Sequence, residues 1–258
     1  MKSVFSIAIF LVVSCFALEG EELHAKWQQY KLHHSKAYEH DEEQLRKSLW
    51  HENFKMVEEH NKLYEAGETT FDMEQNQFSD MKKEELNQYL NAVLSQNLFE
   101  QNVQDFPKLF NDPVPDTWDW RTVGGLNPVV NQGLCGCCWT FSSVAALEFQ
   151  YWKATNGTLV KFSQQQLLNC VSNSTCRRGG TSRDSFRYLK DHKLQNSTTY
   201  PYIGKDKQCT YDESLGVLKS VTSWKSIAKG DEVALKNAIY SIGPITNTVS
   251  VLEDFVFY

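Results

Sequence analysis

The chain has 258 residues, of which 41% are hydrophobic and 22% charged, and its formal net charge is −6. This composition is typical of a globular protein and excludes a disordered chain, collagen or a coiled coil. The acidic balance also disfavours a broad nucleic-acid-binding surface. The sequence has no phosphate-binding loop, dinucleotide fingerprint or metal-ligand cluster, so we predict no cofactor and no metal.

Residues 1–17 have the pattern of a secretory signal peptide. Lys2 supplies a positive flank, residues 4–16 are apolar apart from two serines, and Ala17 suits the cleavage position. The flanks disfavour the alternative, a buried N-terminal helix. The apolar core is too short for a typical transmembrane helix, and no second run approaches that length. We therefore expect no membrane span and a location in the secretory pathway, in the lysosome or outside the cell.

Residues 18–112 contain no cysteine, and their apolar residues recur at helical spacing. Helices are predicted around residues 23–34 and over residues 41–64. Six residues of the second helix share one face, because they follow one another at steps of four, four, three, four and four. They are Glu42, Arg46, Trp50, Asn53, Val57 and Asn61. Because an asparagine on a packed face needs partners, we expect this face to contact a polar backbone. An ordinary amphipathic helix is the alternative.

This series of six residues resembles the propeptide signature of the papain family, in its cathepsin L branch. Asn76, Phe78 and Asp80 resemble the second propeptide motif, although Glu74 stands where that motif often has glycine. The resemblance implies that residues 18–113 form an inhibitory propeptide, which lies backwards along the active-site cleft and keeps the zymogen inactive. Acid pH would weaken its hold by protonating carboxylates that support native pairs.

A linker and a domain boundary are expected within residues 105–114. Three prolines between residues 107 and 115 interrupt helices there, and the stretch reads as exposed chain. The Asp-Trp-Arg run at residues 119–121 resembles the mature N-terminus of the family. The resemblance therefore implies processing near Val114 and a papain-like peptidase domain over residues 114–258.

Residues 131–141 resemble the nucleophile segment of papain-like cysteine proteases. In this register Cys138 is the nucleophile, at the start of a predicted helix. A helix N-terminus and a nearby imidazolium favour the thiolate, which attacks a peptide carbonyl and forms an acyl-enzyme. The side-chain amide of Gln132 and the backbone N–H of Cys138 would stabilise the oxyanion. The alternative, in which all cysteines form bridges, is disfavoured because Gln132, Gly136 and Trp139 are also in register.

Six cysteines follow the signal peptide and allow 15 full pairings. The resemblance implies two disulfides, Cys135–Cys176 and Cys170–Cys209. Two adjacent thiols then remain, the nucleophile and Cys137, which replaces the serine usual in the family. Three roles stay open for this extra thiol: a bystander, a resolving thiol for an oxidised nucleophile, or half of a vicinal disulfide.

The substrate-binding residues are also implied by the resemblance. Gly179 and Gly180 match the glycine pair whose backbone meets the substrate, where a side chain would block close approach. Thr181 and Ser182 follow, where relatives often have the apolar residues that line the S2 pocket, so a preference for large hydrophobic side chains stays open. Two arginines precede the glycines and make the spacing from the preceding cysteine one residue longer than usual.

The expected partners are protein and peptide substrates, the chain's own propeptide and cystatin-type inhibitors, and we expect a monomer. Sequons at Asn156, Asn173 and Asn196 predict surface glycans, although such triplets also arise by chance.

In the family, the catalytic histidine and its orienting asparagine lie about 130–150 residues after the nucleophile. Here 120 residues follow Cys138, and His192 is the only histidine among them. We expect His192 to lie near the end of an outer helix, at the surface, and not to act as a base. The prediction is a C-terminally incomplete endopeptidase precursor that does not complete turnover as it stands. The alternative is a truncated product that acts as a propeptide-type inhibitor or pseudoenzyme.

The fold class that the resemblance implies is α+β, with a helical left lobe and a right lobe built on an antiparallel β-barrel. This chain would contain the left lobe and the opening of the right lobe, from about Lys219. Strand-like residues 217–224 and 245–251 would lack barrel partners. The helix predicted over residues 231–242 could not bury its apolar face fully.

Overall fold

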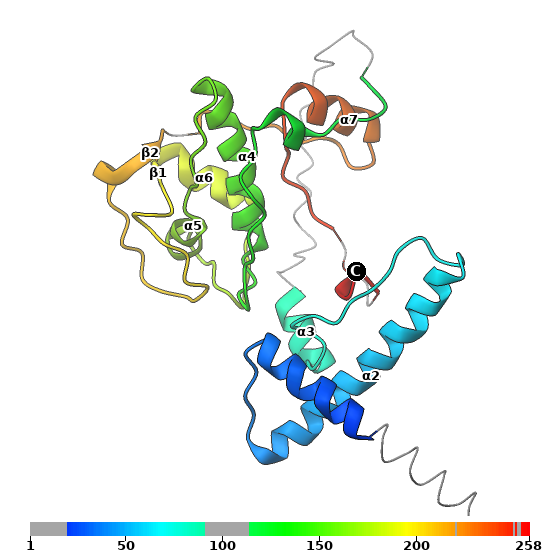
Figure 1. Cartoon of the computed structure of the whole chain (residues 1–258). Coiled ribbons are helices and arrows are strands. Elements are labelled where there is room, and N and C mark those ends of the chain that lie inside the picture. Colours follow the sequence, from blue (N-terminus) through cyan, green and yellow to red (C-terminus); the bar gives the residue numbers. More distant parts are fainter. Residues whose placement is uncertain (1–19, 91–113, 220, 250, 252–253) are drawn as a thin grey trace, which may run out of the picture. The chain divides into compact units, whose positions relative to one another are not determined.

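The computed structural model describes residues 20–90, 114–219, 221–249, 251 and 254–258 (Figure 1). The signal-peptide prediction and the predicted linker, up to residue 113, lie outside these residues. The chain divides into two compact units. The first unit contains residues 20–86 together with the last residues of the chain, and the second unit extends to residue 249. No helix in the described part of the chain is long and apolar enough to cross a membrane.

The first unit is built on two packed helices, residues 20–33 and α2 (His40–Glu65). Their contact is a buried aromatic cluster of Trp27, Tyr30 and Trp50. The ring centroids of the two tryptophans are 5.5 Å apart, and Trp27 Nε1 donates a hydrogen bond of 3.0 Å to Glu43. The helical spacing in the sequence places all three rings on the contact face, so their apolar area is removed from water.

Two asparagines of α2 fasten an extended segment to the helix. Asn53 Nδ2 donates to the carbonyl of Ser79 at 2.8 Å. Asn61 forms two bonds of 2.8 Å with the backbone of Met73, donating to its carbonyl and accepting from its N–H. The expectation that this face contacts a polar backbone is therefore confirmed. Beyond this segment, α3 covers Lys83–Leu90.

A fully buried carboxylate, Asp80, joins the two helices to the loop before α3. Its side chain accepts from Lys36 Nζ at 3.0 Å and from the hydroxyl of Tyr38. Arg46 donates to the carbonyl of Asp80 at 3.1 Å and also forms an ion pair with Glu85. A buried charge is tolerated only when it is paired in this way, so these contacts depend on one another.

The last described residues pack on the same extended segment, although they lie far away in the sequence. The N–H of Glu74 donates to the carbonyl of Phe257 at 2.8 Å, and Asn76 Nδ2 donates to the carbonyl of Val256 at 2.6 Å. Val256, in the short helix η3 (Asp254–Val256), and Phe257 are both buried. Residues 254–258 are thus part of the first unit.

The second unit is centred on α4 (Cys138–Ala154), against which α5 (Gln164–Cys170) and α6 (Ser182–Asp191) pack. Side-chain caps fix where the shorter helices begin: Ser163 Oγ accepts from the N–H of Gln166 at 2.9 Å, and Thr181 caps α6 in the same way. The core between the helices is apolar. Its buried members are Trp139, Val144, Leu147, Phe162, Leu167, Val171, Leu189 and Leu194.

The strands differ from the prediction. β1 (Leu194–Gln195) pairs antiparallel with β2 (Gly216–Leu218), so the residues predicted to lack a partner have one in the helical lobe. The strand beyond Leu218 and the strand predicted over residues 245–251 are absent from the described residues. An extended segment without neighbouring strands leaves its N–H and C=O groups unpaired, which disfavours a strand there.

The helix predicted over residues 231–242 is present as α7 (Glu232–Ser241), and it buries little of its surface. Only Ala238 of α7 is buried, whereas Val233 is 72% exposed. The indole of Trp120, in the short helix η1 (Trp120–Val123), donates to the carbonyl of Ile239 at 2.7 Å. A second short helix, η2 (Glu213–Leu215), precedes β2. The incomplete burial agrees with the expectation for this helix.

Candidate active site

The thiol of Cys138 lies at the first residue of α4 and is exposed, whereas the thiol of the adjacent Cys137 is buried. Both cysteines are free, so no vicinal disulfide links them. Cys137 instead lies in an apolar cluster with Cys135 and Leu168. Only the thiol of Cys138 is therefore placed to meet a substrate.

The surroundings of Cys138 do not by themselves favour the thiolate. Partial desolvation by the neighbouring protein raises the pKa of this thiol, and the backbone N–H groups of Trp139 and Cys138 lower it by less. The contacts of His192 are with another residue: its Nδ1 lies 2.9 Å from the carbonyl of Tyr188, and its ring stacks on the Tyr188 ring at 4.2 Å between centroids. His192 follows the last residue of α6, at the end of a helix as predicted, but it is half-buried rather than exposed at the surface as expected.

Gln132 lies in the turn before α4 and is held by its backbone. The hydroxyl of Tyr202 donates to the Gln132 carbonyl at 2.6 Å and also lies 3.1 Å from the sulfur of Cys137. On the other side of the turn, Asn131 Oδ1 accepts from the N–H of Gly133 at 2.8 Å. Sequence reasoning did not identify Tyr202 as a support of this site, because the contact spans 70 residues and leaves no periodic signal.

A disulfide brings the glycine pair to the nucleophile segment. Cys135 is bonded to Cys176, and the N–H of Gly136 donates to the carbonyl of Cys176 at 2.9 Å. Gly180 lies so close to Trp139 that a Cβ atom would be 2.6 Å from the indole ring. A side chain at position 180 would therefore clash with Trp139, the residue after Cys138, which explains the need for glycine there. The second disulfide links Cys170 and Cys209, so both pairs are those that the resemblance implies.

The wall beyond the glycines is polar. Thr181 Oγ1 donates to the carboxylate of Asp184 at 2.6 Å, and this hydroxyl also accepts from the Asp184 N–H at 3.2 Å. Ser182 is the first residue of α6 and is half-buried. The hydroxyl of Thr181 is therefore engaged in the cap of the helix, and neither residue offers a large apolar surface.

The three sequons lie in turns of the second unit. Asn156 and Asn173 are exposed and have positive φ angles of 53° and 62°. Asn196 is half-buried, and its Oδ1 accepts from the N–H and the hydroxyl of Thr198 at 3.1 and 2.6 Å. All three positions remain predictions for glycosylation.

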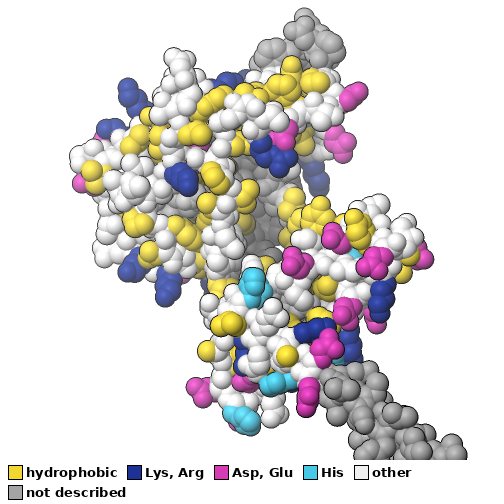
Figure 2. Space-filling view, viewed as in Figure 1, with side chains coloured by type: hydrophobic (Ala, Val, Ile, Leu, Met, Phe, Trp, Pro, Cys, Tyr) yellow, Lys and Arg dark blue, Asp and Glu magenta, His cyan; other side chains and the backbone are white. Residues whose placement is uncertain are grey.

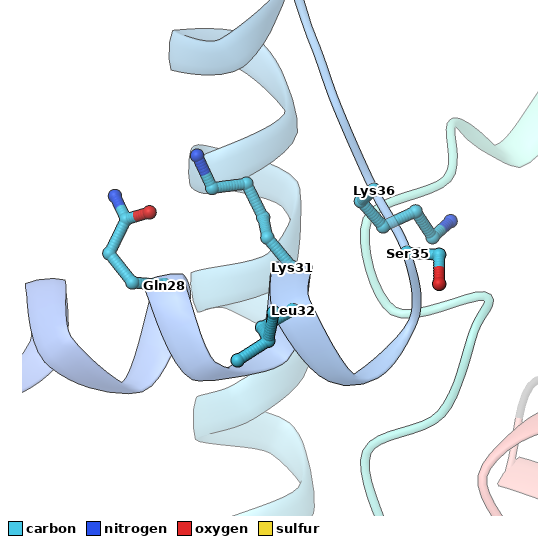
Figure 3. A pocket seen from close by; sticks show the side chains of 5 residues that line it. All are labelled: Gln28, Lys31, Leu32, Ser35 and Lys36. Atoms are coloured by element: carbon cyan, nitrogen blue, oxygen red, sulfur yellow. The ribbon is translucent and has the colours of Figure 1, made fainter.

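A pocket of about 500 Å³ lies in the first unit, beside residues 28–36 (Figure 3). The two amines that border it are already used, because Lys31 pairs with Glu43 and Lys36 with Asp80. It is therefore not a candidate for the catalytic site. No group of three or more His, Cys, Asp or Glu side chains in the described residues could hold a metal ion.

The comparisons with known proteins define the class. Residues 114–258 match the model of the papain family cysteine protease, and residues 27–86 match the cathepsin propeptide inhibitor domain. The chain belongs to the papain family of cysteine proteases and carries the propeptide domain of a zymogen. The predicted family is therefore confirmed.

The relatives include cathepsins of the L type. The chain is 36% identical over 243 residues to a cathepsin L-like proteinase of Fasciola hepatica, a match covering 90% of this chain and 71% of that protein. It is 37% identical over 264 residues to human cathepsin L2, covering 98% of this chain and 78% of the relative.

A solved structure confirms the fold class. The digestive procathepsin L2 proteinase of the larval midgut of Tenebrio molitor has a TM-score of 0.78 and 29% identity. The match covers 86% of this chain and 73% of that structure. The chain therefore has the papain-like α+β fold together with the propeptide region.

Proposed function

We propose that this chain is the precursor of a cysteine endopeptidase in which Cys138 is the nucleophile. The observation that carries the proposal is the exposed thiol at the first residue of α4, preceded by a turn in which Tyr202 anchors the backbone of Gln132. A helix N-terminus provides N–H groups and a positive dipole where negative charge develops. Membership of a cysteine protease family supports the same role for the thiol.

The proposed reaction is hydrolysis of a peptide bond in two steps. The thiolate of Cys138 attacks the carbonyl carbon, and the oxyanion accepts hydrogen bonds from the Gln132 amide and the Cys138 N–H. Collapse of this intermediate breaks the C–N bond, the leaving amine takes a proton from the protonated base, and an acyl-enzyme remains. Water then hydrolyses the thioester and restores the thiol. Removing one oxyanion donor typically lowers kcat about 10²- to 10³-fold.

The mechanism also needs a base, and no described residue has been identified in that role. Neighbouring protein raises the pKa of Cys138, so an imidazolium is needed to favour the thiolate, and His192 is bonded elsewhere. We therefore propose the activity for the complete gene product, read from start codon to stop codon.

The transcript beyond the codon for Tyr258 tests this directly. An Asp-His pair followed by Asn-Ser-Trp would support the peptidase. A stop codon at that point would contradict proteolysis by this product and favour an inhibitor.

In the proposed zymogen, residues 18–113 inhibit the peptidase domain until acid pH loosens them and cleavage near Val114 removes them. Gly179 and Gly180 would meet the substrate backbone, and Thr181 and Ser182 would border the adjacent side chain. The two disulfides suit an oxidising compartment, which supports the proposed secretory, lysosomal or extracellular location. Cystatin-type inhibitors and a monomeric state belong to the same proposal.

An activity-based probe tests the nucleophile. After acid processing of the complete gene product, an epoxide or vinyl-sulfone probe should label Cys138, and Cys138→Ala should abolish labelling. Cys137→Ala is the matched control, because it removes the neighbouring thiol and should leave labelling unchanged. Labelling of Cys137 with Cys138 untouched would contradict the proposed register.

A further inference from the structure

The two arginines that lengthen the segment before the glycine pair form the tip of a tight turn. We call residues 175–179 the arginine turn. Thr175 and Gly179 are paired as a β-bridge, and the N–H of Gly179 donates to the carbonyl of Thr175 at 2.8 Å. Arg177 and Arg178 lie between them, and both are exposed.

The turn is fixed from inside, so its tip is held in place. The N–H of Arg178 donates to the hydroxyl of Thr175 at 2.9 Å, and the N–H of Cys176 donates to the carboxylate of Asp206 at 2.7 Å. Gly179 has a φ of 72°, a conformation that a residue with a side chain adopts only with strain. These hydrogen bonds engage the backbone of the turn and do not involve the guanidinium groups.

The arginine turn is attached to the segment that carries the exposed thiol. Its second residue, Cys176, is bonded to Cys135, three residues before Cys138, and it also accepts from the N–H of Gly136. On its other side the turn continues into Gly180, which packs against the ring of Trp139. Both ends of the turn are therefore attached to the segment that carries the nucleophile.

The two guanidinium groups have no charged partner among the described residues, unlike other arginines of the chain. Arg46 pairs with Glu85, Arg121 with Asp119 and Arg187 with Asp184. In the described part of the chain, no ion pair or hydrogen bond engages the guanidinium group of Arg177 or of Arg178. Figure 2 shows basic side chains at several places on the visible face of the second unit, so any test must separate the turn from the general charge.

We propose that the arginine turn selects peptide substrates with an Asp or Glu side chain two or three residues before the scissile bond. This inference rests on the proposed function, because it assumes that the peptide crosses Gly179 and Gly180 to reach Cys138. A guanidinium group binds a carboxylate through a planar pair of hydrogen bonds, and two consecutive arginines without a charged partner offer this twice. Because both are exposed, we expect a preference of about fivefold.

The test compares peptides that differ only in a carboxylate or an amide at one side chain. The complete, acid-processed gene product is given matched fluorogenic peptides with Glu or Gln at the second or the third position before the bond, at a pH above about 5.5, where Glu is ionised. We expect kcat/KM to be about fivefold higher for one Glu peptide over its Gln partner. The ratio should fall towards one between about 0.1 M and 1 M salt, as the Debye length shrinks from about 10 Å to about 3 Å.

Three variants assign the preference to the turn. Arg177→Gln with Arg178→Gln should abolish the ratio, whereas Arg177→Lys with Arg178→Lys should keep most of it. Lys225→Gln with Lys229→Gln removes the same charge from another loop of the second unit and should leave the ratio unchanged. Equal cleavage of Glu and Gln peptides by the unmodified protein would overturn the inference while leaving the proposed function intact. Cleavage of neither peptide, with Cys138 unlabelled, would overturn the proposed function and the inference with it.

Discussion

In the first unit a buried charge joins the helices to the loop, whereas in the second unit disulfides join segments that are distant in the sequence. Asp80 is fully buried and is paired with Lys36 and Tyr38. Neither residues 20–86 nor residues 254–258 contain a cysteine, so the described part of the first unit folds without a disulfide. The second unit has both disulfides, Cys135–Cys176 and Cys170–Cys209.

Because of this difference, different solution conditions act on the two units. Ion pairs and histidines respond to pH, whereas disulfides respond to the redox state of the compartment. Six of the seven histidines lie between residues 24 and 60, and Figure 2 shows acidic side chains concentrated over α2. We therefore expect acid to destabilise the first unit before the second unit.

The largest effect is expected from removing the buried charge of the first unit. Asp80→Ala leaves the ammonium of Lys36 half-enclosed without its counter-ion, and breaking a buried pair typically lowers the free energy of unfolding by about 3–5 kcal/mol. Hydrogen exchange of the α2 amides in the full chain at pH 7 measures this loss, and the second unit should be unaffected. Asp41→Ala, at an exposed position of α2, is the control and should change little. Unchanged protection of α2 in Asp80→Ala would contradict the central role of this carboxylate.

The next effect separates the two disulfides, which close loops of almost the same length, with sequence separations of 41 and 39 residues. Cys135→Ser with Cys176→Ser, and Cys170→Ser with Cys209→Ser, should each lower the stability of the second unit by about 2–4 kcal/mol. Only the first pair should also reduce probe labelling of Cys138 at temperatures where both variants remain folded, because it releases the arginine turn. Equal labelling of the two variants would show that the disulfide has no role at the site beyond stability. Thermal unfolding and labelling together make the measurement.

Much of the first unit could be predicted because its signals are local. A repeat of three and four residues is enough to place Trp50 and Asn53 on the same face of α2, and the need of a buried amide for partners predicts a polar backbone beside it. The packing of Val256 and Phe257 on residues 74–76 could not be predicted in this way. That contact joins segments about 180 residues apart, and no periodicity records it.

The second unit shows the same division between local and distant signals. The start of α4 at Cys138 follows from the motif and the helical spacing after it. The strand pairing of β1 with β2 was not predicted, because the family pattern assigned residues 217–224 to a barrel and not to the helical lobe. The support of Gln132 by Tyr202 was missed for a similar reason, since a hydroxyl that bonds a carbonyl 70 residues away leaves no pattern in the sequence.

A smaller effect is expected at this support. Tyr202→Phe removes the hydroxyl that donates to the Gln132 carbonyl and keeps the ring that packs edge-on against Phe141 at 5.1 Å. A lost hydrogen bond of this type lowers stability by about 0.5–1.5 kcal/mol. If the bond also positions the Gln132 amide, kcat should fall while KM changes little. Cys137→Ser is the companion variant, because it keeps a polar partner for Tyr202 and should retain kcat. A fall in stability with kcat unchanged would restrict Tyr202 to a structural role.

The smallest effect tests the pH response of the first unit. Burial, with nearby positive charge, lowers the pKa of His34 and of His51 below the ordinary value of about 6.5. The unfolded chain therefore binds protons more readily than the folded unit, so the stabilising contribution is full above about pH 6.5 and is lost as pH falls through the lowered folded values. His34→Gln with His51→Gln should flatten the dependence of α2 protection on pH between about 6.5 and 5. His40→Gln, at an exposed position, is the matched control and should leave the slope as it is. If the double variant keeps the full slope, the pH response belongs to carboxylates such as Glu85. The Arg46 guanidinium lowers the pKa of Glu85, so the stabilising contribution of this carboxylate is lost only as pH falls below about 4.5.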